Sequence, residues 1–251
     1  MERGRPTLMR SLFKKIARWT GLSEKRCPVC SALMASGTGP VCPECAESMR
    51  PRTGGYCTKC GEMFGSNTDT PTICAACRLD PPQWDTLHFH GRYDGVLRDM
   101  ILSYKFNGGL GKTRLLSNMA VAALQRSNFR TPDLIVPVPL HTKRLQWRGF
   151  NQSTELARAL GRTLHRPVPK TALTRVRHTP PQTRLGLKER QSNIKNAFAA
   201  DPDKVNGKVI LMVDDVYTTG STLGECTRTL RRAGAAGVDV LVLARAQQEP
   251  A

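Results

Sequence analysis

Hydrophobic residues are sparse before residue 80 and follow regular patterns after it. Continuous apolar runs, such as KVILMV over residues 208–213, are typical of strands buried inside a parallel sheet. Apolar positions spaced by three and four residues predict helices between such runs. In chain order the pattern predicts a strand at 86–93, helices at 95–106 and 111–126, a strand at 134–138, a loop at 139–152, a helix at 153–164, a strand at 208–213, a helix at 222–233 and a strand at 238–243. Strands that alternate with helices predict an α/β fold with a doubly wound, mainly parallel sheet.

The chain before residue 81 has a different character. Residues 8–19 place apolar side chains on one helical face and basic ones elsewhere, which predicts a short basic amphipathic helix. We favour docking of this helix on the protein's own surface over contact with a membrane. Asp80 is followed by two prolines, which interrupt regular structure. We therefore expect three parts, namely a basic amphipathic tail at 1–26, a small cysteine-rich part at 27–80 and the α/β domain at 81–251.

The size and hydropathy of the chain limit where it works. It has 251 residues and a mass of 27.7 kDa, enough for one medium domain with a small appendage. No segment approaches the roughly 18 consecutive apolar residues of a transmembrane helix. No apolar segment of the signal-peptide kind follows the basic start. We therefore expect a cytoplasmic protein with no stable membrane span.

Basic residues exceed acidic ones by a wide margin, and the excess is uneven. The 38 Lys and Arg against 20 Asp and Glu give a formal net charge of +18. Residues 131–200 hold thirteen basic and three acidic side chains, a net charge of +10, whereas residues 27–90 have a net charge of −2. Such a block predicts the wall of an anion site and favours nucleic acid, phosphorylated metabolites or acidic lipid as partners. A genome composition that favours Arg is the alternative explanation.

Eight of the nine cysteines form four C-x-x-C pairs. Two thiolates at this spacing lie on one side of a tight turn, and two such turns complete a tetrahedral four-sulfur site. Zinc is favoured over disulfides because no export signal is visible. We expect two structural Zn²⁺ sites that join the first two pairs and the last two, while crossed pairing stays open. The predicted metal ligands are Cys27, Cys30, Cys42, Cys45, Cys57, Cys60, Cys74 and Cys77.

The most informative segment is VDDVYTTGST at residues 213–222. A buried strand ends in Asp214 and Asp215, and a loop of small residues then opens into a helix. Amides and hydroxyls of such a loop can surround a phosphate, and the helix N-terminus adds positive potential. Adjacent carboxylates can accept hydrogen bonds from two ribose hydroxyls and keep Mg²⁺ nearby. The pattern predicts a site for a ribose 5-phosphate; a plain helix cap by Ser221 or Thr222 is the alternative.

This segment resembles the fingerprint of the type I phosphoribosyltransferases, which bind 5-phosphoribosyl-1-pyrophosphate (PRPP) with magnesium. Together with IVPVPLHTKRLQWRGFNQ, TPPQTRLGLKERQSNIKNAF, the four C-x-x-C pairs and the closing VDVLVLAR, it is similar to the ComF family, also described as competence protein F or GntX-like. The similarity covers residues 27–246. It implies a type I phosphoribosyltransferase fold and a double zinc ribbon at 27–80.

The resemblance also implies roles for individual residues. Asp214 and Asp215 would bind the ribose hydroxyls and act in catalysis. The 5-phosphate would lie on Thr218, Thr219, Gly220, Ser221 and Thr222. The pyrophosphate would face Arg144, Arg148, Gly149, Asn151 and Gln152. A hood over residues 175–198 would add Arg175, Arg177, Gln182, Arg190 and Asn193, although any one of its arginines can instead belong to a solvated basic face.

Two functions follow from these features. The first is pentosyl transfer from PRPP with Mg²⁺ to an acceptor that the sequence does not specify, with Glu155, Glu189 and His178 as candidates for a general base. The second is a catalytically inactive accessory protein that binds single-stranded DNA or a DNA-uptake partner, because the family is linked to natural transformation. In that case the tail and residues 131–200 would contact DNA, since residues 27–90 are net acidic. Aromatic residues make up only 6% of the chain, so a base-stacking platform for single strands is not evident.

Overall fold

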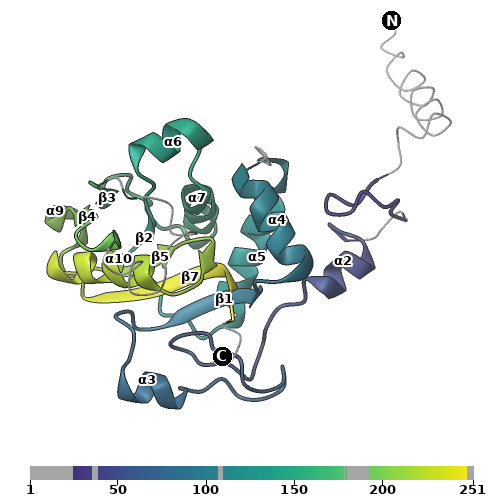
Figure 1. Cartoon of the computed structure of the whole chain (residues 1–251), viewed down its shortest axis with the longest axis horizontal. Helices are drawn as coiled ribbons and strands as arrows, with labels where there is room; N and C mark the ends of the chain where they lie inside the picture. The colour runs from purple at the N-terminus through teal and green to yellow at the C-terminus, as the bar shows by residue number, and fades with distance from the viewer. Residues whose placement is uncertain (1–24, 36–38, 107–109, 178, 180–192, 248–251) are drawn as a thin grey trace, which may run out of the picture. The chain divides into compact units, whose positions relative to one another are not determined.

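The computed structural model describes residues 25–35, 39–106, 110–177, 179 and 193–247 (Figure 1). The chain divides into two compact units, Met1–Met49 and Arg50–Ala251. The amphipathic helix expected at 8–19 lies outside the described residues. The boundary expected between residues 80 and 81 stays a prediction, and the compact units divide the cysteine-rich part between them.

The first unit is built around its cysteines. Its helix α2 (Pro43–Ser48) begins with a proline, which is preorganised for the first helical position. An antiparallel bridge joins Arg26 to Leu33 across the first C-x-x-C turn. The buried hydrophobic side chains of the described part are Cys27, Met34, Val41, Cys42, Cys45 and Met49. Such a core contains too little apolar surface to hold residues 25–35 and 39–49 together without further cross-links.

A parallel sheet forms the centre of the second unit. Its strands run in the order β1 (Leu87–Arg92), β7 (Gly237–Arg245), β5 (Val209–Val213) and β2 (Leu134–Pro137), and every neighbouring pair is parallel. The short strand β6 (Val216–Tyr217) extends the sheet beside the far end of β7. All nine residues of β7 are buried, as expected for a strand covered on both faces. The predicted parallel α/β fold is confirmed.

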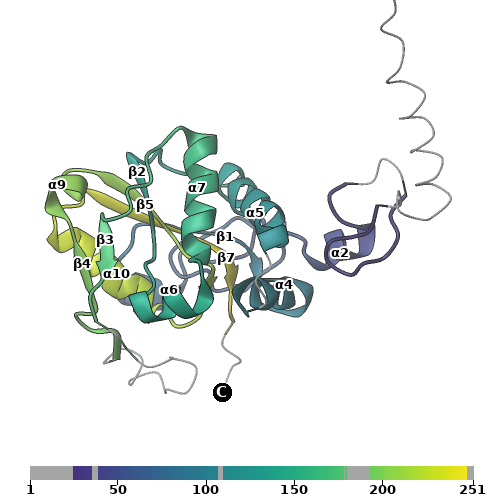
Figure 2. The same ribbon diagram turned by 90° about the horizontal axis from the view of Figure 1, so that it is seen from above.

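Helices cover both faces of this sheet (Figures 1 and 2). On one face α5 (Thr113–Arg126) and α7 (Gln152–Leu164) pack against each other and against the strands, and α10 (Ser221–Arg232) packs on the opposite face. An antiparallel pair of three-residue strands, β3 (Leu173–Arg175) and β4 (Phe198–Ala200), lies beside α10. The remaining bounds are α3 (Ala75–Leu79), α4 (Gly95–Phe106), η1 (Leu110–Lys112), α6 (Thr142–Arg148) and α9 (Pro202–Val205).

The second ribbon is part of the α/β core. Tyr56, Cys60 and Met63 pack against the buried cluster that contains Trp84 and Phe89. The rings of Tyr56 and Phe89 meet edge to face with centroids 5.0 Å apart. These contacts place the 57–77 cysteines in the same compact unit as the sheet.

The predicted loop over 139–152 is wrong for residues 142–148, which form helix α6. His141 caps this helix by accepting a hydrogen bond at Nδ1 from the amide of Lys143, and Gly149 ends it with a φ of 80°. None of the α6 residues is buried, so hydrophobic periodicity gave no signal for it. Within the described ranges no helix combines the length and the apolar character needed to cross a bilayer.

Candidate functional site

The two acidic residues lie where β5 ends at the carboxyl edge of the sheet. Asp214 accepts a hydrogen bond at Oδ1 from Ser153 Oγ at 2.8 Å and another from the amide of Asp215 at 2.9 Å. Desolvation by surrounding protein atoms, followed by the negative charge of Asp215, raises the pKa of Asp214. Asp214 is partly exposed, whereas Asp215 is only 7% exposed. Asp214 is therefore the more accessible of the two.

Asp215 has a cationic partner whose side chain is 19% exposed. Lys105, in the last turn of α4, places Nζ 2.9 Å from Asp215 Oδ1. Burial on its own would lower the pKa of Lys105, but the charge of Asp215 outweighs it and the pKa is raised. The ion pair therefore keeps Lys105 charged and fixes the position of the second acid. The sequence carries no sign of this partner, because a lysine near a helix C-terminus is common for reasons of the helix dipole.

The 218–222 loop joins β6 to the N-terminus of α10. Gly220 precedes the helix in the left-handed region, with a φ of 76°, and its carbonyl accepts the amide of Gly224 at 2.7 Å. The hydroxyls of Thr219 and Ser221 lie 3.0 Å apart. The first turn of α10 contains no acidic residue, so its own side chains do not neutralise the positive end of the helix dipole. Such a loop can receive an anion.

Gly220 also has no room for a side chain. An added Cβ would lie 2.9 Å from Tyr217 Cε2 and 3.1 Å from Trp84 Cη2. We expect Gly220→Ala to lower the free energy of unfolding by more than the roughly 1–2 kcal/mol that a left-handed backbone costs an alanine. Gly207→Ala is the matched control, because Gly207 has a φ of 69° and no atom within 4 Å of the added Cβ. Urea unfolding of both variants measures the difference; equal losses would show that the two rings do not confine the loop.

Three arginines form a basic wall near the acids. Arg144 and Arg175 both donate to Thr179, the first to its carbonyl at 3.4 Å and the second to its hydroxyl. Arg148 donates from Nη1 to Gln152 Oε1 at 2.8 Å. Burial lowers the pKa of all three, and burial together with the charge of Arg144 lowers that of Arg175 to about 10. All three remain cationic at neutral pH.

Two of the arginines, Arg148 and Arg175, are close enough to the acids for their charges to interact. The charges of Asp214 and Asp215 act on the pKa of Arg148, and that of Asp214 acts on Arg175. Gln152 Nε2 and Arg175 Nε are buried and have no hydrogen-bond partner among the described residues. Buried donors of this kind are costly unless an acceptor reaches them. The wall therefore offers donors that suit the oxygens of an anion.

Other predicted site residues have structural contacts. Asn151 caps α7 by accepting the amide of Ser153 at 3.1 Å and donates to the Val138 carbonyl at 3.0 Å. Arg177 donates to the carbonyls of Asn193 and Lys195 at 2.8 and 2.6 Å, which ties together two parts of the expected hood. The candidate base Glu155 pairs with Arg158 at 2.5 Å. The residues Gln182, Arg190, His178 and Glu189 lie outside the described part of the chain.

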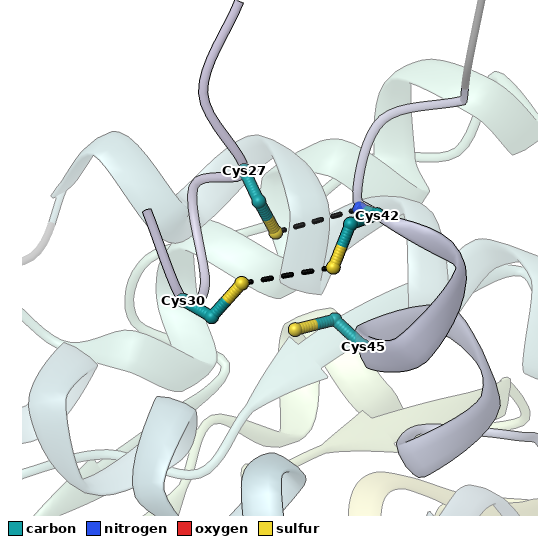
Figure 3. A group of neighbouring side chains, drawn as sticks. All are labelled: Cys27, Cys30, Cys42 and Cys45. Atoms are coloured by element: carbon teal, nitrogen blue, oxygen red, sulfur yellow. Dashed lines mark hydrogen bonds between the residues drawn. The ribbon is translucent and has the colours of Figure 1, made fainter. Parts of the chain in front are cut away.

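The cysteines form two clusters in sequential order. In each cluster the four Sγ atoms lie within 4.8 Å of one another, and Figure 3 shows the first, formed by Cys27, Cys30, Cys42 and Cys45. The amide of Cys42 donates to Cys27 Sγ at 3.4 Å. Burial acts to raise the pKa of Cys27, but backbone hydrogen bonds outweigh it and lower the pKa to about 6. The predicted sequential grouping is confirmed.

The second cluster repeats these features. It consists of Cys57, Cys60, Cys74 and Cys77, and the amide of Cys74 donates to Cys57 Sγ at 3.4 Å. Amide hydrogen bonds of this kind stabilise thiolates, the form that binds metal. Four thiols within this span fit a tetrahedral Zn²⁺ site with no position left open, which is typical of structural rather than catalytic zinc. Cys226, the ninth cysteine, lies on the buried face of α10 and is part of the hydrophobic core.

Comparisons with known proteins match both the cysteine-rich part and the α/β part of the chain. Residues 22–78 match the double zinc ribbon domain family, and residues 120–251 match the phosphoribosyl transferase domain family. Competence protein F of Haemophilus influenzae is 35% identical over 179 residues, which cover 69% of this chain and 78% of that protein. DNA utilization protein YhgH of Escherichia coli is 39% identical over 176 residues, 68% of this chain and 77% of that protein.

Solved structures match less of the chain. The glutamine phosphoribosylpyrophosphate amidotransferase of B. subtilis is 21% identical, with a TM-score of 0.36, over 52% of this chain and 25% of that chain.

Proposed function

The chain belongs to the ComF family, which joins a double zinc ribbon to a phosphoribosyltransferase domain, and from that premise we propose that it binds PRPP with magnesium at the carboxyl edge of its sheet. The observation that carries the proposal is the order of parts at this edge. An acid pair ends β5, and a glycine-hinged loop then opens into α10. Ligands of open α/β sheets bind at this edge.

Each part suits one portion of PRPP. The 218–222 loop would hold the 5-phosphate with backbone amides and hydroxyls. The partly exposed Asp214 would accept a ribose hydroxyl, with its orientation fixed by Ser153. Arg144, Arg148 and Arg175 would face the pyrophosphate, because guanidinium groups pair with phosphate oxygens through two donors.

The same residues suit departure of pyrophosphate from the sugar. In pentosyl transfer the bond between the ribose C1 and the pyrophosphate oxygen breaks, and positive charge develops on the sugar. The arginines would stabilise the negative charge that collects on the departing pyrophosphate. The carboxylate of Asp214 would stabilise the sugar on its hydroxyl side. Bound Mg²⁺ would add charge neutralisation on the pyrophosphate oxygens.

The direct test is calorimetry with PRPP in the presence and absence of Mg²⁺. We expect saturable binding that strengthens with Mg²⁺, and weaker binding of ribose 5-phosphate and of pyrophosphate, each of which fills only part of the site. Pyrophosphate release would then be followed with nucleobases, amines and DNA as acceptors. Absence of PRPP binding by the folded, zinc-loaded chain would refute the proposal.

A role in handling single-stranded DNA is the second candidate. It is favoured by the names of the relatives, a competence protein and a DNA utilization protein, together with the net charge of +10 over residues 131–200. In the same block α6 exposes 73% of Trp147, next to Arg148 in sequence. Exposed aromatic rings among cations suit base stacking and backbone contact. Asp214 and Asp215 lie outside this block, so substitution of the acid pair can separate the two functions.

A further inference from the structure

A single buried guanidinium joins the second cysteine cluster to the 218–222 loop. Arg245, the last residue of β7, is 5% exposed. It donates from Nε to the carbonyl of Cys60 at 2.7 Å and from Nη1 to the carbonyl of Thr218 at 3.0 Å. Its guanidinium also lies 4.2 Å from the ring centroid of Tyr217. A predicted metal ligand and the start of the loop are thus held by one side chain.

Trp84 makes a second connection between the same two places. Its Nε1 donates at 2.7 Å to the carbonyl of Lys59, which lies inside the Cys57–Cys60 turn. Its ring meets that of Tyr217 edge to face, with centroids 5.5 Å apart and planes at 89°. It also approaches Gly220 so closely that an added Cβ there would lie 3.1 Å from Cη2. The indole therefore forms the rear wall of the loop and rests on the cysteine turn.

The cysteine turn is itself held tightly against the sheet. Gly61 adopts a φ of 70°, and its amide donates to the Cys57 carbonyl at 2.8 Å. An added Cβ at Gly61 would lie 2.9 Å from Leu87 Cδ2 and 3.2 Å from Arg245 Cγ. The cysteine turn and the end of β7 are closely packed, so a change in the shape of the turn must move Arg245.

We propose that Arg245 and Trp84 are positioning residues that transmit the metal-bound shape of the second cluster to the 218–222 loop, so that phosphate affinity depends on the metal held by Cys57, Cys60, Cys74 and Cys77. The inference rests on the proposed function, in which this loop binds the 5-phosphate. Loss of the metal releases the turn and shifts the carbonyls of Lys59 and Cys60. The buried guanidinium then loses one acceptor, and the loop loses its rear support.

The test compares full-length, zinc-treated variants at the two clusters. Cys60→Ser alters the second cluster, and Cys30→Ser is the matched change in the first. We expect Cys60→Ser to weaken ribose 5-phosphate binding about tenfold in calorimetry while pyrophosphate binding stays unchanged, because pyrophosphate faces the separate arginine wall. Hydrogen exchange at the amides of 218–222 should speed up in Cys60→Ser and stay as in the unaltered protein in Cys30→Ser.

The variant Trp84→Phe tests the connection to the loop without altering a metal ligand. It retains a ring against Tyr217 but removes the Nε1 donor to Lys59, and it leaves all eight cysteines in place. Faster exchange confined to 218–222, with β5 amides still protected, would support transmission through the indole. Unchanged exchange in both Cys60→Ser and Trp84→Phe would overturn the inference. If the unaltered protein binds no ribose 5-phosphate, the proposed function fails, yet the exchange measurement still decides whether the cluster supports the loop.

Discussion

Replacement of both Asp214 and Asp215 by asparagine is expected to abolish magnesium-dependent binding of PRPP. The change removes the carboxylates that would accept the ribose hydroxyls and keep the cation nearby. Hydrogen bonds to charged groups contribute about 1.5–3 kcal/mol each, so a loss of roughly a hundredfold or more is expected. Calorimetry with PRPP and Mg²⁺ measures it. Full affinity in the double variant would show that the ribose does not bind at this acid pair.

The double variant needs controls because Lys105, with 19% of its side chain exposed, pairs with the buried Asp215. Removal of one member of a buried ion pair can cost about 3–5 kcal/mol of stability. Asp214→Asn alone avoids this cost, since the ion pair of Lys105 is with Asp215. Asp133→Asn is the matched acid outside the site, where Oδ2 accepts the amide of Val209 at the start of β5 at 2.8 Å. It should leave PRPP affinity unchanged.

The same variants separate PRPP binding from DNA binding. Affinity for a single-stranded oligonucleotide should be nearly unchanged in the double variant and should fall steeply with added salt, because backbone contacts release counterions. A flat salt response would argue against contact with the phosphate backbone. Loss of DNA binding together with PRPP binding, in a variant that remains folded, would place both ligands at the acid pair.

Removal of zinc is expected to unfold the described part of the first unit while the parallel sheet persists. Among the described residues of that unit, half of the buried hydrophobic side chains are the cysteines Cys27, Cys42 and Cys45, and the others are Met34, Val41 and Met49. Binding of a structural zinc ion supplies on the order of 10 kcal/mol, which exceeds what so small an apolar core provides. After chelation, hydrogen exchange over residues 27–45 should approach the rate of an unfolded chain, whereas β5 and β7 stay protected.

Metal content provides the control for this experiment. The unaltered chain should bind two zinc ions, and Cys226→Ser should still bind two, because Cys226 is buried in the core of the sheet apart from both cysteine clusters. Persistent protection of residues 27–45 in metal-free protein would show that the first unit folds without its ion.

Elements with a buried face were predictable from the sequence. The helix predicted at 95–106 coincides with α4, and the apolar runs at 208–213 and 238–243 locate β5 and the centre of β7. Helix α6 was not predictable in this way because it buries none of its residues. The strands β3 and β4 are only three residues long, too short for an alternating pattern to be recognised.

Some parts of the candidate site were predictable from the sequence and others were not. The acid pair and the 218–222 loop are contiguous in sequence, so local pattern located them at the end of a strand. Lys105 meets Asp215 across 110 positions, and Arg245 reaches the Cys60 carbonyl across 185. Such contacts depend on the order of strands in the sheet and leave no local trace. The four C-x-x-C pairs predicted the clusters because a metal site requires both its ligand type and its spacing.

The two ribbons look alike in sequence, yet the second shares a compact unit with the sheet and the first does not. A chain shortened to begin at Arg50 keeps the second cluster together with the sheet. A chain shortened to begin after Asp80, at the two prolines, would remove Tyr56, Cys60 and Met63 from Trp84 and Phe89 and expose a hydrophobic patch on the α/β core. Any transplant of this α/β fold and its 218–222 loop into another protein therefore has to carry the second ribbon along.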